Sequence, residues 1–320
     1  MPVKLRITFI FLLLFDALAS SAQEAAVIRI GVFTDCQYCD CNSDDKRQYR
    51  LSLAKLDSCI EVFNALQLDA VFHLGDMIDH NYNSYDSILP RFHRFKAPLN
   101  LVLGNHDYMI KNRYKKGLID HIGISQNLRS SDTVRVKDGN RMGAGCPAGA
   151  YSTVKGIWRF IALNGDDLSF TGPQSGEQKE ERNEMLSDSY MHLLYSGMPW
   201  NGGIGKNQVK WLEAQLEEAL KLGQNVIVLC HFPLFGKEDH LLFNNKEIFE
   251  LISRYPCVKA YFNGHYHSGG YKQKDGIHFV NFRGMVDTGQ NAFAVVTLTK
   301  DSIIIKGYGR EPDRNLRIRP

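Results

Sequence analysis

Side chains able to bind metal ions follow several short apolar runs of this chain. The segments that carry them are Asp35-Cys36-Gln37, Gly75-Asp76-Met77-Ile78-Asp79, Gly104-Asn105-His106-Asp107, His231 and Gly264-His265-Tyr266-His267. One Asp or His after a strand carries little information, but a set this rich in carboxylate, imidazole and amide groups predicts one polar cleft with two metal ions. Two adjacent metal ions suit phosphoester hydrolysis better than any other chemistry.

The expected ligands divide between two metal positions. We expect Asp76 to bridge them, because a carboxylate between two cations offsets their mutual repulsion. Hard oxygen donors mixed with imidazoles suit Mn²⁺, Fe or Zn²⁺, since no thiolate selects a softer metal. The remaining ligands are assigned to the first position, Asp35 and His267, and to the second, Asn105, His231 and His265.

His106 follows Asn105 directly. It is the expected general acid, or a stabiliser of negative charge on the leaving oxygen. Asp79 and Asp107 are expected to cap turns or to orient the histidines rather than to bind metal themselves.

The first half of the chain alternates strand and helix signals, which places the ligands at one edge of a sheet. Apolar or periodic runs predict strands at 27–34, 70–74 and 99–103, with helices at 47–66 and 84–95 between them. Such repeats favour a largely parallel sheet, in which ligands bind beyond the carboxyl ends of the strands. Asp35, Asp76 and Asn105 lie immediately beyond those ends.

The second half adds further strands and a long polar segment. A hairpin is expected at 150–163, helices at 206–222 and 246–254, and strands at 225–230, 258–263, 277–282, 292–298 and 302–306. Residues 165–205 look polar and irregular. The predicted fold class is α/β (α+β), a two-sheet β-sandwich flanked by helices, formed by one domain over residues 23–320.

The N-terminus predicts export. Lys4 and Arg6 precede an apolar run at 7–15 that is too short to cross a bilayer, and Ser20-Ser21-Ala22 offers small residues for cleavage. Residues 1–22 are therefore interpreted as a signal peptide of a secreted or periplasmic protein. An uncleaved anchor is the alternative.

Composition narrows the class of partner. Hydrophobic residues make up 44% and charged residues 23%, which is typical of a globular protein, and the formal net charge is only +3. This balance predicts no binding to nucleic acid and no stable attachment to a membrane surface. It leaves the oligomeric state open.

The cysteines are expected to be mostly buried thiols. The chain has seven of them, three close together as Cys36, Cys39 and Cys41. An exported protein can form disulfides, so one bond that involves Cys39 or Cys41 is expected. A thiolate zinc site is the alternative, although no second cysteine pair is present to complete it.

In their order along the chain, the segments that carry the expected metal ligands resemble those of the calcineurin-like metallophosphoesterase superfamily. The resemblance extends from about Ile30 to Phe282. The resemblance implies a four-layer fold around a two-sheet sandwich and a dinuclear site built from the ligands named above. It also implies direct attack by a metal-bound hydroxide. A broad-specificity phosphomonoesterase or phosphodiesterase is an alternative, as is a scaffold without enzymatic activity.

Gln37 departs from the superfamily pattern, which usually has His at this position. An amide oxygen is the poorer ligand, so the first metal position is expected to bind more weakly and to prefer Mn²⁺ or Mg²⁺. Asp35-Cys36-Gln37-Tyr38, with Asn201-Gly202-Gly203-Ile204-Gly205 ahead of a helix that carries Trp211, resembles the manganese-dependent ADP-ribose/CDP-alcohol diphosphatases. The resemblance implies a small-molecule nucleotide substrate whose pyrophosphate bond is cleaved.

Substrate contacts are expected from loops near the strand ends. The backbone of Asn201, Gly202 and Gly203 could approach a phosphate closely, because Gly has no side chain. A plain turn before the helix is the alternative for this segment. Phe235 could stack on a nucleobase, an interaction worth ~1–3 kcal/mol, or pack against the core.

Overall fold

The ligand-bearing loops of the first half follow the parallel strands of a six-stranded sheet. The computed structural model describes residues 27–123, 148–187 and 197–319. The strands β1, β2 and β3 are parallel, whereas β10, β11 and β12 extend the same sheet in antiparallel pairing. Their order is β12-β11-β10-β1-β2-β3. The bounds are β1 (Ile28–Phe33), β2 (Ala70–His73), β3 (Leu99–Leu101), β10 (Ala292–Leu298), β11 (Ser302–Gly309) and β12 (Arg314–Arg317).

A second six-stranded sheet carries the histidines of the second half. Its order is β4-β5-β6-β7-β9-β8, with parallel strands in the middle and antiparallel strands at both edges. The bounds are β4 (Tyr151–Lys155), β5 (Trp158–Ala162), β6 (Asn225–Leu229), β7 (Val258–Asn263), β8 (Gly270–Lys274) and β9 (Ile277–Asn281).

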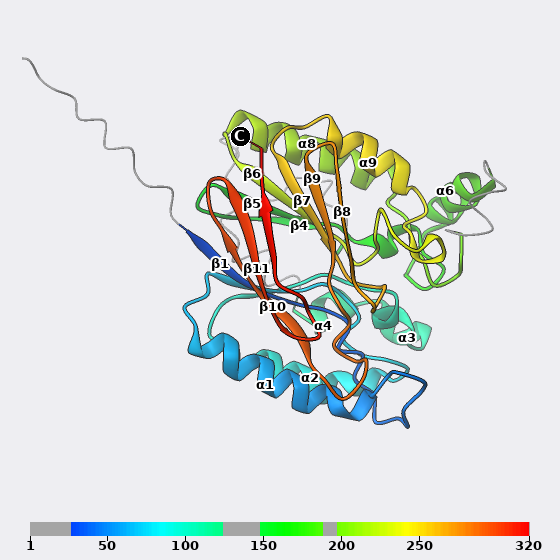
Figure 1. Cartoon of the computed structure of the whole chain (residues 1–320). Helices are drawn as coiled ribbons and strands as arrows, with labels where there is room; N and C mark the ends of the chain where they lie inside the picture. Colours follow the sequence, from blue (N-terminus) through cyan, green and yellow to red (C-terminus); the bar gives the residue numbers. More distant parts are fainter. Residues whose placement is uncertain (1–26, 124–147, 188–196, 320) are drawn as a thin grey trace, which may run out of the picture.

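Helices cover the outer faces of the two sheets and leave the inner faces against each other (Figure 1). Helices α1 (Ser52–Ala65) and α2 (Tyr85–Phe92) lie on the first sheet, and α8 (Lys206–Lys221) and α9 (Asn245–Ser253) lie on the second. Between the sheets the rings of Phe72 and Phe160 lie 4.8 Å apart, within one shared hydrophobic core. These layers confirm the predicted two-sheet sandwich with flanking helices.

Shorter elements line the loops. They are α3 (Asn112–Lys115), α4 (Leu118–His121) and α6 (Gly176–Ser187), with 3-10 turns at Tyr49–Leu51, Tyr82–Ser84, His106–Tyr108, Gly165–Leu168 and Glu238–His240. The helices of the described ranges are all too short or too polar to span a membrane.

Several elements differ from the sequence-based expectations, among them α6, β8 and β12. The segment 165–205, expected to be irregular, contains α6, of which Leu186 alone is buried. Strand β8 is exposed along its whole length, and β12 buries only Leu316. These elements lack an apolar face, so the hydrophobic periodicity used to find helices and strands gives no signal for them.

The cysteines of the described residues have the expected states, one disulfide and otherwise buried thiols. Cys39 and Cys41 form a disulfide. The other cysteines of the described ranges, Cys36, Cys59, Cys230 and Cys257, are free and buried. The disulfide leaves Cys36 as the one free thiol of this cluster, too few for the alternative zinc site. Cys146 and the expected signal peptide lie outside the described residues.

Candidate metal centre

The carboxyl ends of the parallel strands from both sheets meet at one polar site. His231 Nε2, beyond β6, lies 3.2 Å from Asp76 Oδ2, beyond β2. His267 Nε2, in the loop after β7, lies 3.3 Å from Asp35 Oδ1, beyond β1. Side chains from two sheets therefore converge, as the strand-end pattern predicted.

The backbone at the site adopts unusual conformations. Asp35, Gln37, Asp76 and His265 have φ angles of 52°, 42°, 59° and 68°. This left-handed region is uncommon for residues other than glycine and costs on the order of 1–3 kcal/mol per residue. These backbone angles direct the four side chains into the site. The strained backbone is stable because the surrounding loops hold it in place.

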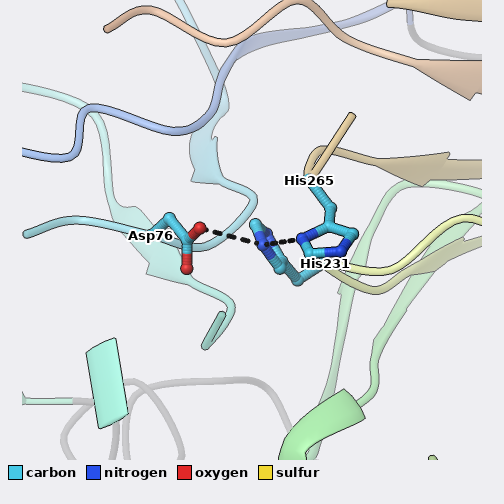
Figure 2. A group of neighbouring side chains, drawn as sticks. All are labelled: Asp76, His231 and His265. Atoms are coloured by element: carbon cyan, nitrogen blue, oxygen red, sulfur yellow. Dashed lines mark hydrogen bonds and ion pairs between the residues drawn. The ribbon is translucent and has the colours of Figure 1, made fainter. Parts of the chain in front are cut away.

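Asp76, His231 and His265 form the most compact group (Figure 2). One potential ligand atom from each lies within 4.8 Å of the others, and all three side chains are buried. His231 Nδ1–H donates to the carbonyl oxygen of Leu74 at 2.9 Å, which leaves Nε2 facing Asp76. His265 Nε2–H donates to Asn201 Oδ1 at 2.9 Å, which turns its Nδ1 toward His231 Nε2 at 3.2 Å.

This group holds a proton where a cation would fit. Burial alone would lower the pKa of His231, but Asp76 outweighs it and raises that pKa to about 10. Burial, together with the charge of His231, holds the pKa of His265 well below its usual range. His231 Nε2–H thus lies between the Asp76 carboxylate and the lone pair of His265. A divalent cation can replace this proton and bind all three groups.

Asn105 supplies a further fit to a metal. Its side chain is 1% exposed, and both its amide oxygen and its amide nitrogen lack a hydrogen-bond partner within the described part of the chain. Its neighbour His106 donates its backbone N–H to Asp76 Oδ1 at 2.8 Å, which keeps this turn close to the carboxylate. Buried polar atoms are nearly always bonded, so an unpaired amide oxygen in such a place suits metal ligation.

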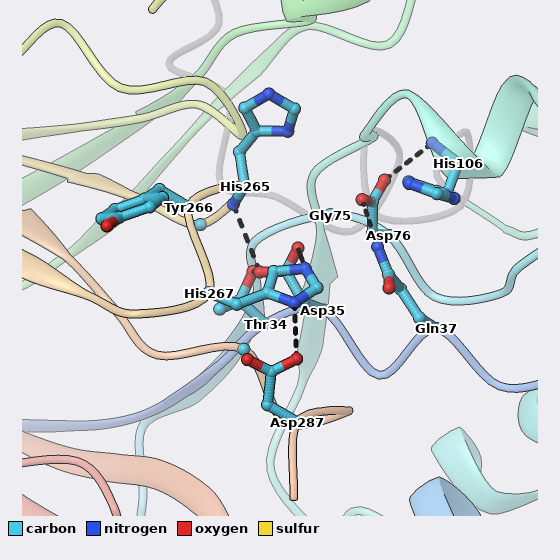
Figure 3. Close-up of polar contacts among 12 residues, drawn as sticks. Thr34, Asp35, Gln37, Gly75, Asp76, His106, His265, Tyr266, His267 and Asp287 are labelled. Carbon is cyan, nitrogen blue, oxygen red and sulfur yellow. Dashed lines mark hydrogen bonds and ion pairs between the residues drawn. The ribbon is translucent and has the colours of Figure 1, made fainter. Parts of the chain in front are cut away.

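Asp35 and His267 form the other half of the site (Figure 3). His267 Nδ1–H donates to Asp287 Oδ1 at 2.9 Å, so its Nε2 faces Asp35. Asp35 Oδ2 accepts from Thr34 Oγ1 at 2.7 Å, while Oδ1 accepts no hydrogen bond from any described residue. Burial would lower the pKa of His267, but Asp35 and Asp287 raise it to about 9. This half also has the chemistry of a cation site.

Gln37 contacts the same bridging carboxylate. Its Nε2 donates to Asp76 Oδ2 at 3.0 Å, and its Oε1 has no hydrogen-bond partner among the described residues (Figure 3). Here the amide is a donor that orients Asp76. Both roles considered from the sequence, tuning and weak ligation, remain predictions.

His106 is held by a buried carboxylate at the edge of the site. Its Nδ1 lies 2.9 Å from Asp79 Oδ1, and Asp79 is fully buried. Burial would lower the pKa of His106, but Asp76 and then Asp79 outweigh that effect and raise it. The protonated imidazole is thereby favoured, as a general acid requires.

Asp107 ties together the turns that carry the site. Its carboxylate accepts backbone N–H bonds from Asp76 and Gly104 at 3.0 Å and from Met77 at 2.9 Å. Burial, and then the charge of Asp76, raises its pKa to about 7. Asp79 and Asp107 therefore have the supporting positions expected for them rather than positions of metal ligands.

The proposed substrate contacts are used within the protein. Asn201 is fully buried, with Oδ1 accepting from His265 and Nδ2 donating to the carbonyl oxygen of Asp239. Phe235 packs edge-on against Phe249 and Phe279, at 5.0 and 4.7 Å between ring centroids. The structure thus favours the packing alternative for Phe235 and gives Asn201 a role in orienting His265.

Gly202 and Gly203 also pack against protein atoms. A Cβ on Gly202 would collide with the carbonyl oxygen of Gly165, and one on Gly203 would lie 3.1 Å from Phe243. The missing side chains allow two loops of the protein to approach each other, so the glycines fit the alternative reading of a turn before the helix.

Substituting Gly202 tests this reading. Gly202→Ala is expected to lower the free energy of unfolding by about 1–3 kcal/mol, because the new methyl group overpacks the contact with Gly165. Urea unfolding without metal or nucleotide measures it. Gly176→Ala is the matched control, since a Cβ there meets no atom within 4 Å. Unchanged stability together with weaker nucleotide binding would instead support a phosphate contact.

Two contacts of the site were missed from the sequence. Asp287 orients His267, and Arg47 Nη1 lies 3.7 Å from Asp79 Oδ2. Neither residue follows a predicted strand closely, and neither belongs to a recognisable motif. Neither residue could therefore be assigned to the site from the sequence alone.

Comparison with known proteins agrees with this geometry. A family model described as calcineurin-like phosphoesterase matches residues 28–269. The chain is 26% identical to the Homo sapiens manganese-dependent ADP-ribose/CDP-alcohol diphosphatase, over 93% of this chain and 94% of that protein. The Arabidopsis thaliana protein of the same name is 25% identical, over 91% and 97%. A crystal structure of a dimetal phosphatase from Danio rerio superposes with a TM-score of 0.77 at 22% identity, over 92% of this chain and 100% of that one.

The chain therefore belongs to the calcineurin-like phosphoesterase family. It is a metal-dependent hydrolase of phosphoester bonds, built on the two-sheet fold that the crystal structure from Danio rerio shares.

Proposed function

We propose that the protein hydrolyses the pyrophosphate bond of nucleoside-diphosphate conjugates such as ADP-ribose and CDP-alcohols. The observation that carries this proposal is the similarity to relatives of that name, which extends over more than nine tenths of both chains. Gln37 in place of the usual His supports it, because the segment Asp35-Cys36-Gln37-Tyr38 resembles the corresponding segment of those diphosphatases. A broad-specificity phosphomonoesterase or phosphodiesterase is the second candidate.

In this proposal the site holds two divalent cations, with Mn²⁺ the expected metal. The first position is assigned to Asp35, Asp76 and His267, and the second to Asp76, Asn105, His231 and His265. When bound, such a pair of ions lowers the pKa of water and stabilises negative charge on the phosphoryl oxygens.

The protein's own side chains would orient the metal ligands and supply a proton. Asn201 and Asp287 hold the two histidines of the Gly-His-Tyr-His segment in the orientation that ligation needs. His106, protonated and oriented by Asp79, donates its proton to the leaving oxygen. The proposal includes export, which rests on the N-terminal sequence.

A small substrate panel tests the reaction. Purified protein with Mn²⁺ is incubated with ADP-ribose, CDP-choline, a cyclic nucleotide and p-nitrophenyl phosphate. Release of AMP from ADP-ribose or CMP from CDP-choline is expected at the highest kcat/KM. A higher kcat/KM for p-nitrophenyl phosphate would reject the proposal in favour of the second candidate, and a protein without any bound or bindable metal would favour a scaffold.

Gln37→His tests the role of the unusual amide. Imidazole is the better ligand, so Mn²⁺ binding at the first position is expected to tighten by about tenfold, with selectivity shifting away from diphosphates. Mn²⁺ titration and the same substrate panel measure the two effects. Gln290→His, on an exposed loop, is the matched control. If affinity and selectivity both stay as in the wild type, Gln37 has no special role.

A further inference from the structure

The segment 285–288 lies between the first metal position and helix α1. Met285 N–H donates to the carbonyl oxygen of Thr34, and Val286 N–H donates to that of Asp35, each at 2.9 Å. Asp287 of the same segment accepts the His267 Nδ1–H bond. The position of this segment therefore determines where His267 Nε2 points.

Lys55 gathers the carbonyl groups of this segment around one ammonium group. Its Nζ lies 2.7, 3.3, 3.2 and 2.6 Å from the carbonyl oxygens of Met285, Val286, Asp287 and Thr288. Successive carbonyls of an extended strand point in opposite directions, so four that converge require a curled backbone. The φ angle of 58° at Thr288, unusual for a β-branched residue, belongs to this curl.

The ammonium group is buried among these dipoles. Lys55 is 6% exposed, and the hydrogen-bond acceptors recorded for its Nζ are all backbone carbonyls of this segment. Burial, with a smaller contribution from Arg310, lowers its pKa to about 8, so the group is still mostly protonated at neutral pH. A lysine ammonium group has three N–H donors, so the four carbonyl oxygens around it must share these donors. The arrangement is that of a cation organising a loop.

We infer that Lys55 is a positioning residue for the first metal position. Its charge curls residues 285–288, the curl places Asp287, and Asp287 holds His267 with Nε2 toward Asp35. The inference rests on the proposed function in one respect, that His267 binds metal. The second metal position shares none of these contacts, since His231 and His265 are oriented by Leu74 and Asn201.

Lys55→Met removes the charge and keeps most of the side-chain volume. Loss of a group that orients a ligand typically weakens metal binding about 10- to 100-fold. We expect a loss of this size in the Mn²⁺ affinity of the first position, with less than a threefold change at the second. Free Mn²⁺ is followed by electron paramagnetic resonance during titration, and the first position is the binding step that Asp35→Asn removes.

Lys259→Met is the matched control. Lys259 is 5% exposed, and its Nζ also donates to a backbone carbonyl, that of Arg319. It lies near the start of β7, at the opposite end of this strand from His265 and His267. It is expected to lower stability without a selective change in metal binding. Equal weakening of both positions by Lys55→Met, no weakening, or the same pattern in Lys259→Met would overturn the inference.

Two further measurements separate the possible failures. If Lys55→Met does not fold, Asp287→Ala removes the acceptor of the His267 Nδ1–H bond while leaving the backbone carbonyl cluster in place, and it must show the same selective loss. If the wild type binds no Mn²⁺, the proposed function is wrong. The ¹⁵N resonances of His267 then decide the inference, which requires a protonated, hydrogen-bonded Nδ1 in the wild type and the loss of that hydrogen bond in Lys55→Met.

Discussion

Asp76→Asn is expected to lower kcat/KM with Mn²⁺ by about 10³-fold or more. Asp76 accepts hydrogen bonds from the backbone N–H of His106 at 2.8 Å and from the side-chain amide of Gln37 at 3.0 Å. His231 Nε2 lies 3.2 Å from the same carboxylate. An asparagine fills the same space but is neutral, so it cannot offset the repulsion between two cations. Charge stabilisation by metal is worth several kcal/mol, and ~1.4 kcal/mol corresponds to a tenfold change in rate.

Metal content measured beside kcat/KM decides what Asp76 does. The matched control is Asp166→Asn, because Asp166 is also 1% exposed but belongs to neither metal position. Burial raises the pKa of Asp166 to about 6, so its pocket tolerates a neutral side chain and activity should stay close to that of the wild type. Normal turnover of Asp76→Asn with both ions still bound would contradict a bridging role.

His106→Ala is expected to lower kcat by about 10²–10³-fold on a substrate with a strongly basic leaving oxygen. A general acid matters most when the leaving oxygen would otherwise depart as an unstable anion. With bis(p-nitrophenyl) phosphate, whose leaving group is stable as an anion, the loss should be much smaller. The ratio of the two losses is measured at saturating Mn²⁺ and a fixed pH.

His80→Ala is the control for a general effect of removing an imidazole near Asp79. His80 Nε2 also lies near Asp79, 3.5 Å from Oδ1, but its side chain is 56% exposed. Removing the His80 imidazole should leave kcat nearly unchanged for both substrates. An equal loss on the two substrates in His106→Ala would contradict proton donation and leave His106 a role in ground-state binding.

The core of the site could be predicted from the sequence because each ligand follows a strand. Asp35, Asp76 and His231 stand beyond apolar runs that are buried on both faces, and parallel strands bring their carboxyl ends to one edge. Neither the fold class nor the set of converging side chains needed knowledge of any long-range contact. The order of segments along the chain was enough.

The supporting contacts could not be predicted in the same way. Asn201, Asp287 and Lys55 act on residues 64, 20 and more than two hundred positions away in the sequence. Their side-chain types are compatible with many roles, and only the tertiary structure selects one. Asn201 illustrates this point, because its Gly-rich context suggested phosphate binding whereas its amide is bonded to His265.

Anomalous diffraction at the manganese edge, from crystals grown with Mn²⁺, locates the metal ions themselves. We expect two peaks that share Asp76 as a ligand, one beside Asp35 and His267 and the other beside Asn105, His231 and His265. No peak near Asp76, or peaks only elsewhere on the protein, would contradict this expectation.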